Sequence, residues 1–120
     1  MLNIIAVGSG GFLGAVCRYL VSLIPVNETL VFPIKTFIIN IIGCIVIGSI
    51  VVAASKNVTM SPYMMLFLKA GFCGGFTTFS TFALETTDLI KTGHLGIAFL
   101  YVVLSMLGGI AVIFMVEIFK

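Results

Sequence analysis

Charged residues are scarce in this chain. Only 8% of its 120 residues are Asp, Glu, Lys or Arg, whereas 61% are hydrophobic. Ordinary soluble domains carry about 25% charged residues, so this chain has too little polar surface for a soluble fold. Lipid is therefore the solvent that the composition indicates. The net charge of +2 and the lack of a basic cluster give no support for a nucleic-acid partner.

The chain also lacks the residue groups that enzymes and metal sites need. Its three cysteines are widely spaced and form no Cys-x-x-Cys pair, which excludes a disulfide framework and a zinc site of that type. A single histidine, His94, has no second imidazole beside it. Because no nucleophile–base pair, phosphate loop or metal cluster is present, the sequence predicts that the protein is not an enzyme.

Long apolar runs are what the chain has instead. Four runs cover about residues 2–24, 33–54, 61–90 and 95–119. Each approaches or exceeds the ~20 residues that a helix needs to cross the hydrocarbon core. The first run has no basic segment before it, so we expect a membrane span rather than a signal peptide. The connections are short, and residues 1–120 are therefore predicted to form one all-α domain of four transmembrane helices.

The third run is unusually long and polar. As one helix its residues would extend roughly 42 Å, more than the core thickness. It contains Gly71, Gly74 and Gly75, which weaken a helix, so we predict a break near residues 74–78. Unwound carbonyls at such a break can hold a cation. Four hydroxyl side chains follow within five residues: Thr77, Thr78, Ser80 and Thr81.

Four further side chains are candidates for an ion pathway, and each has a structural alternative. Phe79 and Phe82 share one helical face, and the electropositive edges of their rings would favour a small anion. Packing alone is the other interpretation of these rings. Asn40 is a carboxamide in a run of isoleucines, so it faces either a pathway or another helix, to which it would hydrogen-bond. Thr36 lies one turn earlier on the same face.

Other polar residues of the runs are assigned by position. Tyr101 and Ser105 share a face and could form a ladder of hydroxyls, although Ser105 could also bond to its own helix. Arg18 is expected to extend to the interface. Glu85 and Asp88 share the far end of the third run near Lys91, where a surface or interfacial ion pair is expected.

Glycines gather in the first run, at Gly8, Gly10, Gly11 and Gly14. They do not form a dinucleotide-binding loop, because the third glycine of that pattern would fall on Leu13. Close packing of helices is the better interpretation.

The positive charges give no bias in orientation. Four spans place both termini on one side of the membrane, and about three Lys or Arg residues fall on each side. Without an excess on one side the chain can insert both ways. Four short spans also enclose little interior. We therefore expect an antiparallel dimer with its two-fold axis in the membrane plane.

Residues 74–82, followed by Glu85, resemble the Fluc (CrcB) family of fluoride channels. The resemblance extends over the whole length and includes Gly14 to Arg18, Asn40 to Gly43, and Tyr101 with Ser105. It implies a dual-topology homodimer with two antiparallel fluoride pores in the cell membrane of a bacterium. The implied activity is passive export of fluoride, which enters acid-exposed cells as HF and is trapped as the anion, so that the channel protects the cell from fluoride toxicity.

The resemblance also implies roles for particular residues. An aromatic box would be formed by Phe79 and Phe82 of opposite subunits. The remaining residues assigned to the fluoride pathway are Asn40, Thr36, Ser80, Thr81, Tyr101 and Ser105. Carbonyls of Gly74 and Thr77 from both subunits would hold a structural sodium ion, and Arg18 and Glu85 would be charges of the vestibule. Some relatives carry another serine where this chain has Gly109, which affects the lower part of the polar track.

A proton-coupled exporter similar to the small multidrug resistance family is the main alternative. Such an exporter needs a titratable carboxylate deep in the membrane. The first span offers Arg18 and no acid, and Glu85 lies away from the expected midplane. A scaffold subunit that transports nothing is a second alternative, and it would tolerate changes at Asn40, Phe79 and Phe82.

Overall fold

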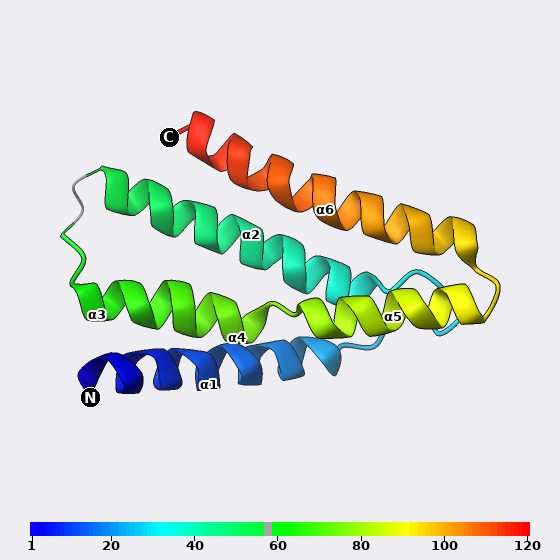
Figure 1. The fold of residues 1–120 in the computed structure, drawn as a ribbon, viewed down its shortest axis with the longest axis horizontal. Helices are drawn as coiled ribbons and strands as arrows, with labels where there is room; N and C mark the ends of the chain where they lie inside the picture. Colours follow the sequence, from blue (N-terminus) through cyan, green and yellow to red (C-terminus); the bar gives the residue numbers. More distant parts are fainter. Residues whose placement is uncertain (57–58) are drawn as a thin grey trace.

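Four helical spans lie side by side along the long axis of the molecule (Figure 1). The computed structural model describes residues 1–56 and 59–120. The first, second and fourth spans are α1 (Leu2–Ser22), α2 (Ile34–Ser55) and α6 (Leu95–Ile118). The third is divided into α3 (Pro62–Met65), η1 (Leu66–Cys73), α4 (Gly74–Phe76) and α5 (Phe79–Lys91). The prediction of an all-α chain with four spans and a broken third span is confirmed.

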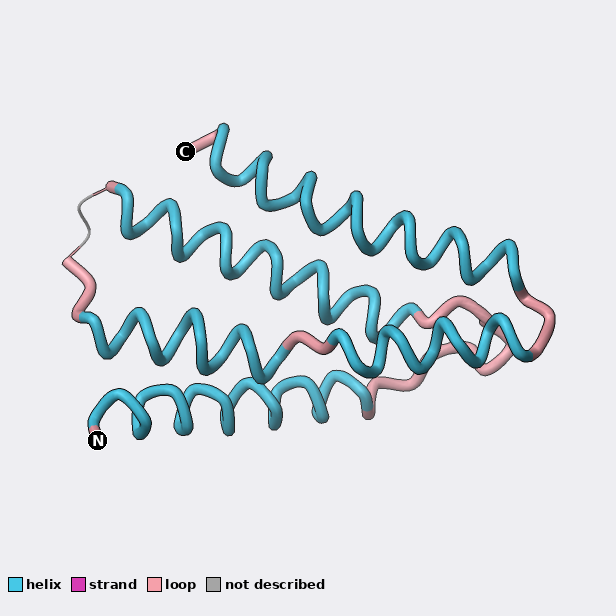
Figure 2. Tube along the Cα trace, in the orientation of Figure 1, coloured by secondary structure: helices cyan, strands magenta, loops and turns pink. Residues whose placement is uncertain are grey.

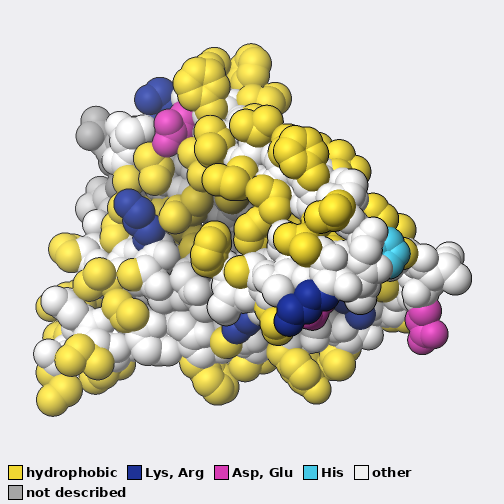
Figure 3. Space-filling model, turned by 45° about the vertical axis from the view of Figure 1, so that its right-hand side comes forward, with side chains coloured by type: hydrophobic (Ala, Val, Ile, Leu, Met, Phe, Trp, Pro, Cys, Tyr) yellow, Lys and Arg dark blue, Asp and Glu magenta, His cyan; other side chains and the backbone are white. Residues whose placement is uncertain are grey.

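The described helices suit a lipid environment. By length and composition α1, α2 and α6 are each able to cross a membrane, and the pieces of the third span run beside them (Figure 2). Hydrophobic side chains cover much of the face shown in Figure 3, and charged side chains are few. In water such a surface would drive aggregation, whereas lipid tails solvate it. The chain is a multi-pass membrane protein.

Glycines bring α1 into backbone contact with the third span. A Cβ atom on Gly10 or Gly14 would collide with the backbone of η1 and α4, and one on Gly71 or Gly75 would collide with the backbone of α1. Small residues permit this approach, as the sequence predicts. Gly8 is different, because nothing lies within 4 Å of the position of its Cβ.

The middle of the third span is a π-helix. Residues Leu66–Cys73 form the i→i+5 pattern, which is rare and is found often at functional sites. The sequence did not predict this feature. The π-helix lies against the glycines of α1, immediately before the break.

The break itself falls at Thr77 and Thr78, at the end of the predicted range. Both residues have extended backbone angles, with ψ of 158° at Thr77 and 121° at Thr78. Gly74 and Gly75 remain helical, so the expectation that the glycines unwind is wrong. Packing of Gly75 against α1 offsets the weak helix propensity of glycine. Beyond the break, the hydroxyl of Thr78 caps α5 by accepting from the amide of Thr81.

A small core lies where α5 meets α6. Leu89, Ala98 and Tyr101 are buried there, and Phe32 and Phe82 pack against them. Tyr101 is fully buried. This core fixes α5 relative to α6 and therefore positions the residues that follow the break.

Candidate functional site

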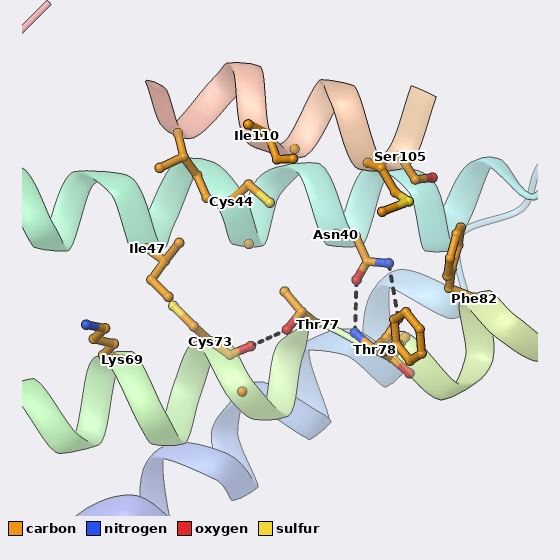
Figure 4. Close-up of a pocket in the computed structure, with 16 residues that line it drawn as sticks. Asn40, Cys44, Ile47, Lys69, Cys73, Thr77, Thr78, Phe82, Ser105 and Ile110 are labelled. Carbon is orange, nitrogen blue, oxygen red and sulfur yellow. Dashed lines mark hydrogen bonds between the residues drawn. The ribbon is translucent and has the colours of Figure 1, made fainter. Parts of the chain in front are cut away.

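Asn40 holds the break through two hydrogen bonds. Its Oδ1 accepts from the amide of Thr78 at 2.9 Å, and its Nδ2 donates to the carbonyl of Thr78 at 3.1 Å (Figure 4). The interhelical hydrogen bond considered for Asn40 is thus confirmed, and its partner is backbone. A broken helix in lipid must satisfy its polar groups in this way.

The same contacts release two carbonyl oxygens. In a continuous α-helix the amide of Thr78 would donate to Gly74, and the amide of Thr81 would donate to Thr77. Here the first donates to Asn40 and the second to the hydroxyl of Thr78, at 3.2 Å. The carbonyls of Gly74 and Thr77 therefore lose their helical partners. These are the two residues to which the resemblance assigns sodium ligands.

A cavity of about 570 Å³ opens between α2, the third span and α6. Figure 4 shows residues from these three spans around it. The predicted residues that line it are Asn40, Gly74, Thr77, Phe79, Phe82 and Ser105. The hydroxyl of Ser105 is buried and has no hydrogen-bond partner in the part of the chain that the structure describes. The alternative in which Ser105 bonds to its own helix is therefore wrong.

The two phenylalanines lie together but have different surroundings. Their ring centroids are 5.8 Å apart, with an angle of 47° between the ring planes. Phe82 also stacks on Tyr101, with centroids 4.9 Å apart and planes at 19°. Phe79 is 79% exposed, so within one chain its ring is largely free of packing contacts.

Glu85 connects three helices. Its carboxylate accepts a hydrogen bond from the hydroxyl of Thr36 on α2 and another from the hydroxyl of Tyr101 on α6, each at 2.8 Å. The expected ion pair with Lys91 is wrong, because these contacts are to hydroxyls. The spacing of Glu85 and Lys91 is neither i, i+3 nor i, i+4, so the two side chains leave different faces of α5.

The hydroxyls of Tyr101 and Ser105 have different surroundings. Thr36 and Tyr101 meet at Glu85, whereas Ser105 faces the large cavity. Ser80 is exposed, and its hydroxyl lies 3.4 Å from that of Thr78.

A second cavity, of about 380 Å³, lies between α1, α2 and α5. Its polar lining consists of Arg18, Tyr19, Ser22, Lys35, Thr36, Thr78, Thr81 and Glu85. The Nε atom of Arg18 is buried and unpaired among the described residues. Thr78 lines both cavities, so its contact with Asn40 stands between them.

Sequence reasoning missed two residues of this site. Thr78 was one of four clustered hydroxyls, without a role. Its position before a helical stretch is typical of a capping residue, and that signal would have found it. Lys35 contributed only to the tally of charges, and its place in the second cavity depends on the packing of α1 against α2.

Comparisons with known proteins agree on one family. The family model described as "CrcB-like protein, Camphor Resistance (CrcB)" matches residues 5–116. The chain is 47% identical over 115 residues to the "Fluoride-specific ion channel FluC" of Chlorobaculum tepidum. This match covers 95% of this chain and 90% of that protein. Proteins with the same name from Chlorobium chlorochromatii and Flavobacterium psychrophilum are each 42% identical. Those matches cover 94% and 92% of this chain, and 88% and 90% of the two relatives.

Proposed function

The chain belongs to the CrcB-like protein family, and from that premise we propose that it is a fluoride-specific ion channel. One structural observation carries the proposal beyond the relatives' names. The pair formed by Asn40 and Thr78 stands between two cavities, beside the rings of Phe79 and Phe82. Polar groups at membrane depth are costly unless they are buried in protein or line a pathway. Their position between two cavities therefore supports a pathway.

The chemistry around the break suits a small, strongly hydrated anion. Hydroxyls, an amide group and ring edges offer partial positive charges that can replace water around the ion. A conduction site must also release the ion, and neutral donors bind more weakly than a fixed cation in contact with it. Asn40, Thr78, Phe79 and Phe82 are uncharged, and Lys69 also lines the large cavity that they share.

We further propose that the channel is an antiparallel homodimer with two pores. One face of the protomer has the large cavity and the exposed ring of Phe79, and nothing in the same chain covers them among the described residues. A second copy, related by a two-fold axis through the break, would cover that face. It would also bring phenylalanine rings of the two chains close to each other. Insertion in both orientations, which the balanced charges permit, would supply such a copy.

A sodium ion fits the same axis. The freed carbonyls of Gly74 and Thr77 are oxygen donors, and both residues line the large cavity, where Gly74 is exposed. One chain offers two such donors, and its two-fold mate would offer the same pair. When bound, the ion would neutralise the carbonyl dipoles that the break leaves unpaired.

The biological role that we propose is passive export of fluoride across the cell membrane. HF formed outside an acid-exposed cell crosses lipid and dissociates in the cytoplasm. A channel that passes the trapped anion outward would lower its cytoplasmic concentration without a second energy source.

Efflux from liposomes tests the function directly. Vesicles that contain the purified protein and internal fluoride should lose fluoride rapidly when a potassium ionophore carries the compensating charge, and matched vesicles loaded with chloride should not lose chloride. Loss should occur without a proton gradient. Equal chloride flux would contradict a fluoride-specific channel.

A proton-coupled exporter is the second candidate because Glu85 is a partly buried carboxylate between helices. It lies roughly 10 Å along α5 from the break, and two hydroxyls already bind it. Transport that stops when the proton gradient is removed would favour the exporter. Fluoride flux driven by the membrane potential alone would favour the channel.

A further inference from the structure

We propose that Lys35 is an anion-capture residue at the entrance of the pathway, positioned by the end of α1. The inference rests on the proposed function and adds to it a residue that concentrates the ion before it reaches the break. It is carried by the second cavity, by the contact of Lys35 with α1, and by the charges around both.

Lys35 contacts the end of α1. Its Nζ donates a hydrogen bond of 2.7 Å to the carbonyl of Ser22, the last residue of α1. An ammonium group has three donors, so two remain free for the cavity. The carbonyls at the end of a helix carry partial negative charge, which stabilises the lysine there.

The place of Lys35 in its own helix is unfavourable. It lies in the first turn of α2, where the helix macrodipole is positive and disfavours a cation. Local rules of this kind are broken most often at functional sites. A cation here adds to the positive end of α2, and the two together attract anions.

The cavity has an excess of positive charge. Arg18 and Lys35 line it together with the carboxylate of Glu85. The two oxygens of that carboxylate accept from Thr36 and Tyr101, so the hydrogen bonds of Glu85 go to hydroxyls rather than to the two cations. Low-dielectric walls focus the field of such a pocket and raise the local concentration of the opposite ion.

The cavity leads to the break. Thr36 follows Lys35 in α2, and Thr81 and Thr78 line the same cavity. Thr78 also lines the large cavity and contacts Asn40. An anion attracted by Lys35 would therefore pass the threonines of this cavity and reach the amide group of Asn40. Lys35 itself stays at the entrance and does not hold the ion at the centre.

Salt dependence distinguishes capture from a structural role. In the efflux assay with sodium held constant, Lys35→Gln should lower fluoride flux about threefold at an ionic strength of about 0.01 M. Added N-methylglucamine isethionate should remove most of this difference, because the Debye length falls from about 30 Å to about 8 Å at 0.15 M. Lys35→Arg should keep the flux of the unchanged protein. Lys91→Gln, which removes the same charge outside the cavity, should also keep it.

Two results would overturn the inference while the channel function stands. One is a flux for Lys35→Gln equal to that of the unchanged protein at low ionic strength. The other is a loss that is the same at every ionic strength, which would mean that Lys35 only ties α2 to α1. An unchanged protein that passes no fluoride would overturn both proposals.

A cysteine variant keeps the test available if Lys35→Gln does not assemble. Lys35→Cys can be modified with a methanethiosulfonate reagent that carries a trimethylammonium group, or with a neutral one of similar reactivity. Only the cationic reagent should raise flux at low ionic strength, and equal effects of the two would contradict capture. The unchanged protein, treated in parallel, controls for Cys17, Cys44 and Cys73.

Discussion

At the scale of the residue, Asn40 does the most for the site. One side chain satisfies both backbone polar groups of Thr78, at a depth where water is scarce. The same carboxamide faces the large cavity, where it lies near the phenylalanine rings. If the proposed function holds, one residue combines a structural and a conducting role, and a substitution should affect both.

Asn40→Ala should lower stability and flux together. It leaves the amide and the carbonyl of Thr78 unpaired, at a cost of about 1–3 kcal/mol for each group. We expect a lower melting temperature in detergent and at least a tenfold loss of fluoride efflux. Ser49→Ala is the matched control, because the hydroxyl of Ser49 is exposed and bonds only to its own helix, at the carbonyl of Ile45. An Asn40→Ala protein with an unchanged melting temperature would contradict the role of the two hydrogen bonds.

Phe79 offers a cleaner test of the rings than Phe82. Phe82 stacks on the buried Tyr101, so its replacement disturbs the core as well as the cavity. Phe79 is largely exposed in the protomer. Phe79→Ile should therefore remove most of the fluoride flux and leave the fold of the protomer intact, as measured by efflux and circular dichroism. Full flux in this variant would mean that the ring of Phe79 only fills space.

At the scale of the element, the contact of α1 with the third span is the tightest in the protomer. Backbone meets backbone where glycines face one another, and π-helix η1 lies within this contact. The first half of the third span therefore packs mainly on α1. The second half, α5, packs on α6 through the core around Tyr101. Thr77 and Thr78 therefore join two halves of the third span, of which the first packs on α1 and the second on α6.

Gly14→Ala should weaken the protein, whereas Gly8→Ala should not. A methyl group on Gly14 would overlap the backbone of Phe72, and overpacking of this kind costs about 1–3 kcal/mol. Gly8 is in the same helix with nothing nearby, and alanine there gains helix propensity of up to about 1 kcal/mol. Thermal unfolding of the two variants in one detergent compares them. Equal melting temperatures would contradict the close contact.

The sequence predicted the elements better than it predicted their contacts. Long apolar runs are local signals, so four spans and a break in the third followed from composition and spacing. The exact break did not, because it depends on Asn40, which is far from Thr78 in the sequence. Glu85 shows the same limit, since its partners Thr36 and Tyr101 belong to other helices. The low helix propensity of glycine predicted unwinding at Gly74 and Gly75, but packing against α1 keeps this segment helical.

At the scale of the whole molecule, one protomer leaves a cavity open on its surface. Its large cavity opens on the face that carries Gly74 and Phe79. The principal dimensions of 49 × 32 × 22 Å describe a thin slab in which four spans enclose little interior. A second copy would thicken the slab and bury the break, which is where the proposed sodium ion belongs.

Removal of sodium should weaken the dimer. Protein exchanged into sodium-free buffer, with N-methylglucamine in place of sodium and only the potassium that the ionophore needs, should lose fluoride flux. Its dimer fraction, measured by cross-linking in detergent, should also fall. Sodium returned to the buffer should restore both, and potassium should restore less. A dimer that is indifferent to sodium would remove Gly74 and Thr77 as its ligands, although the channel function would remain.

The division of the third span also bears on how the protein is made. Neither the part before the break nor α5, with its 13 residues, reaches the ~20 residues that carry a helix across the bilayer unaided. Each part would enter lipid with unpaired backbone at one end. Because α2 precedes the third span in the chain, Asn40 can already be in the membrane when Thr78 leaves the ribosome. Synthesis from the N-terminus thus produces Asn40 before Thr78, the residue whose backbone it pairs. The order of the spans in the chain therefore favours correct folding of the break.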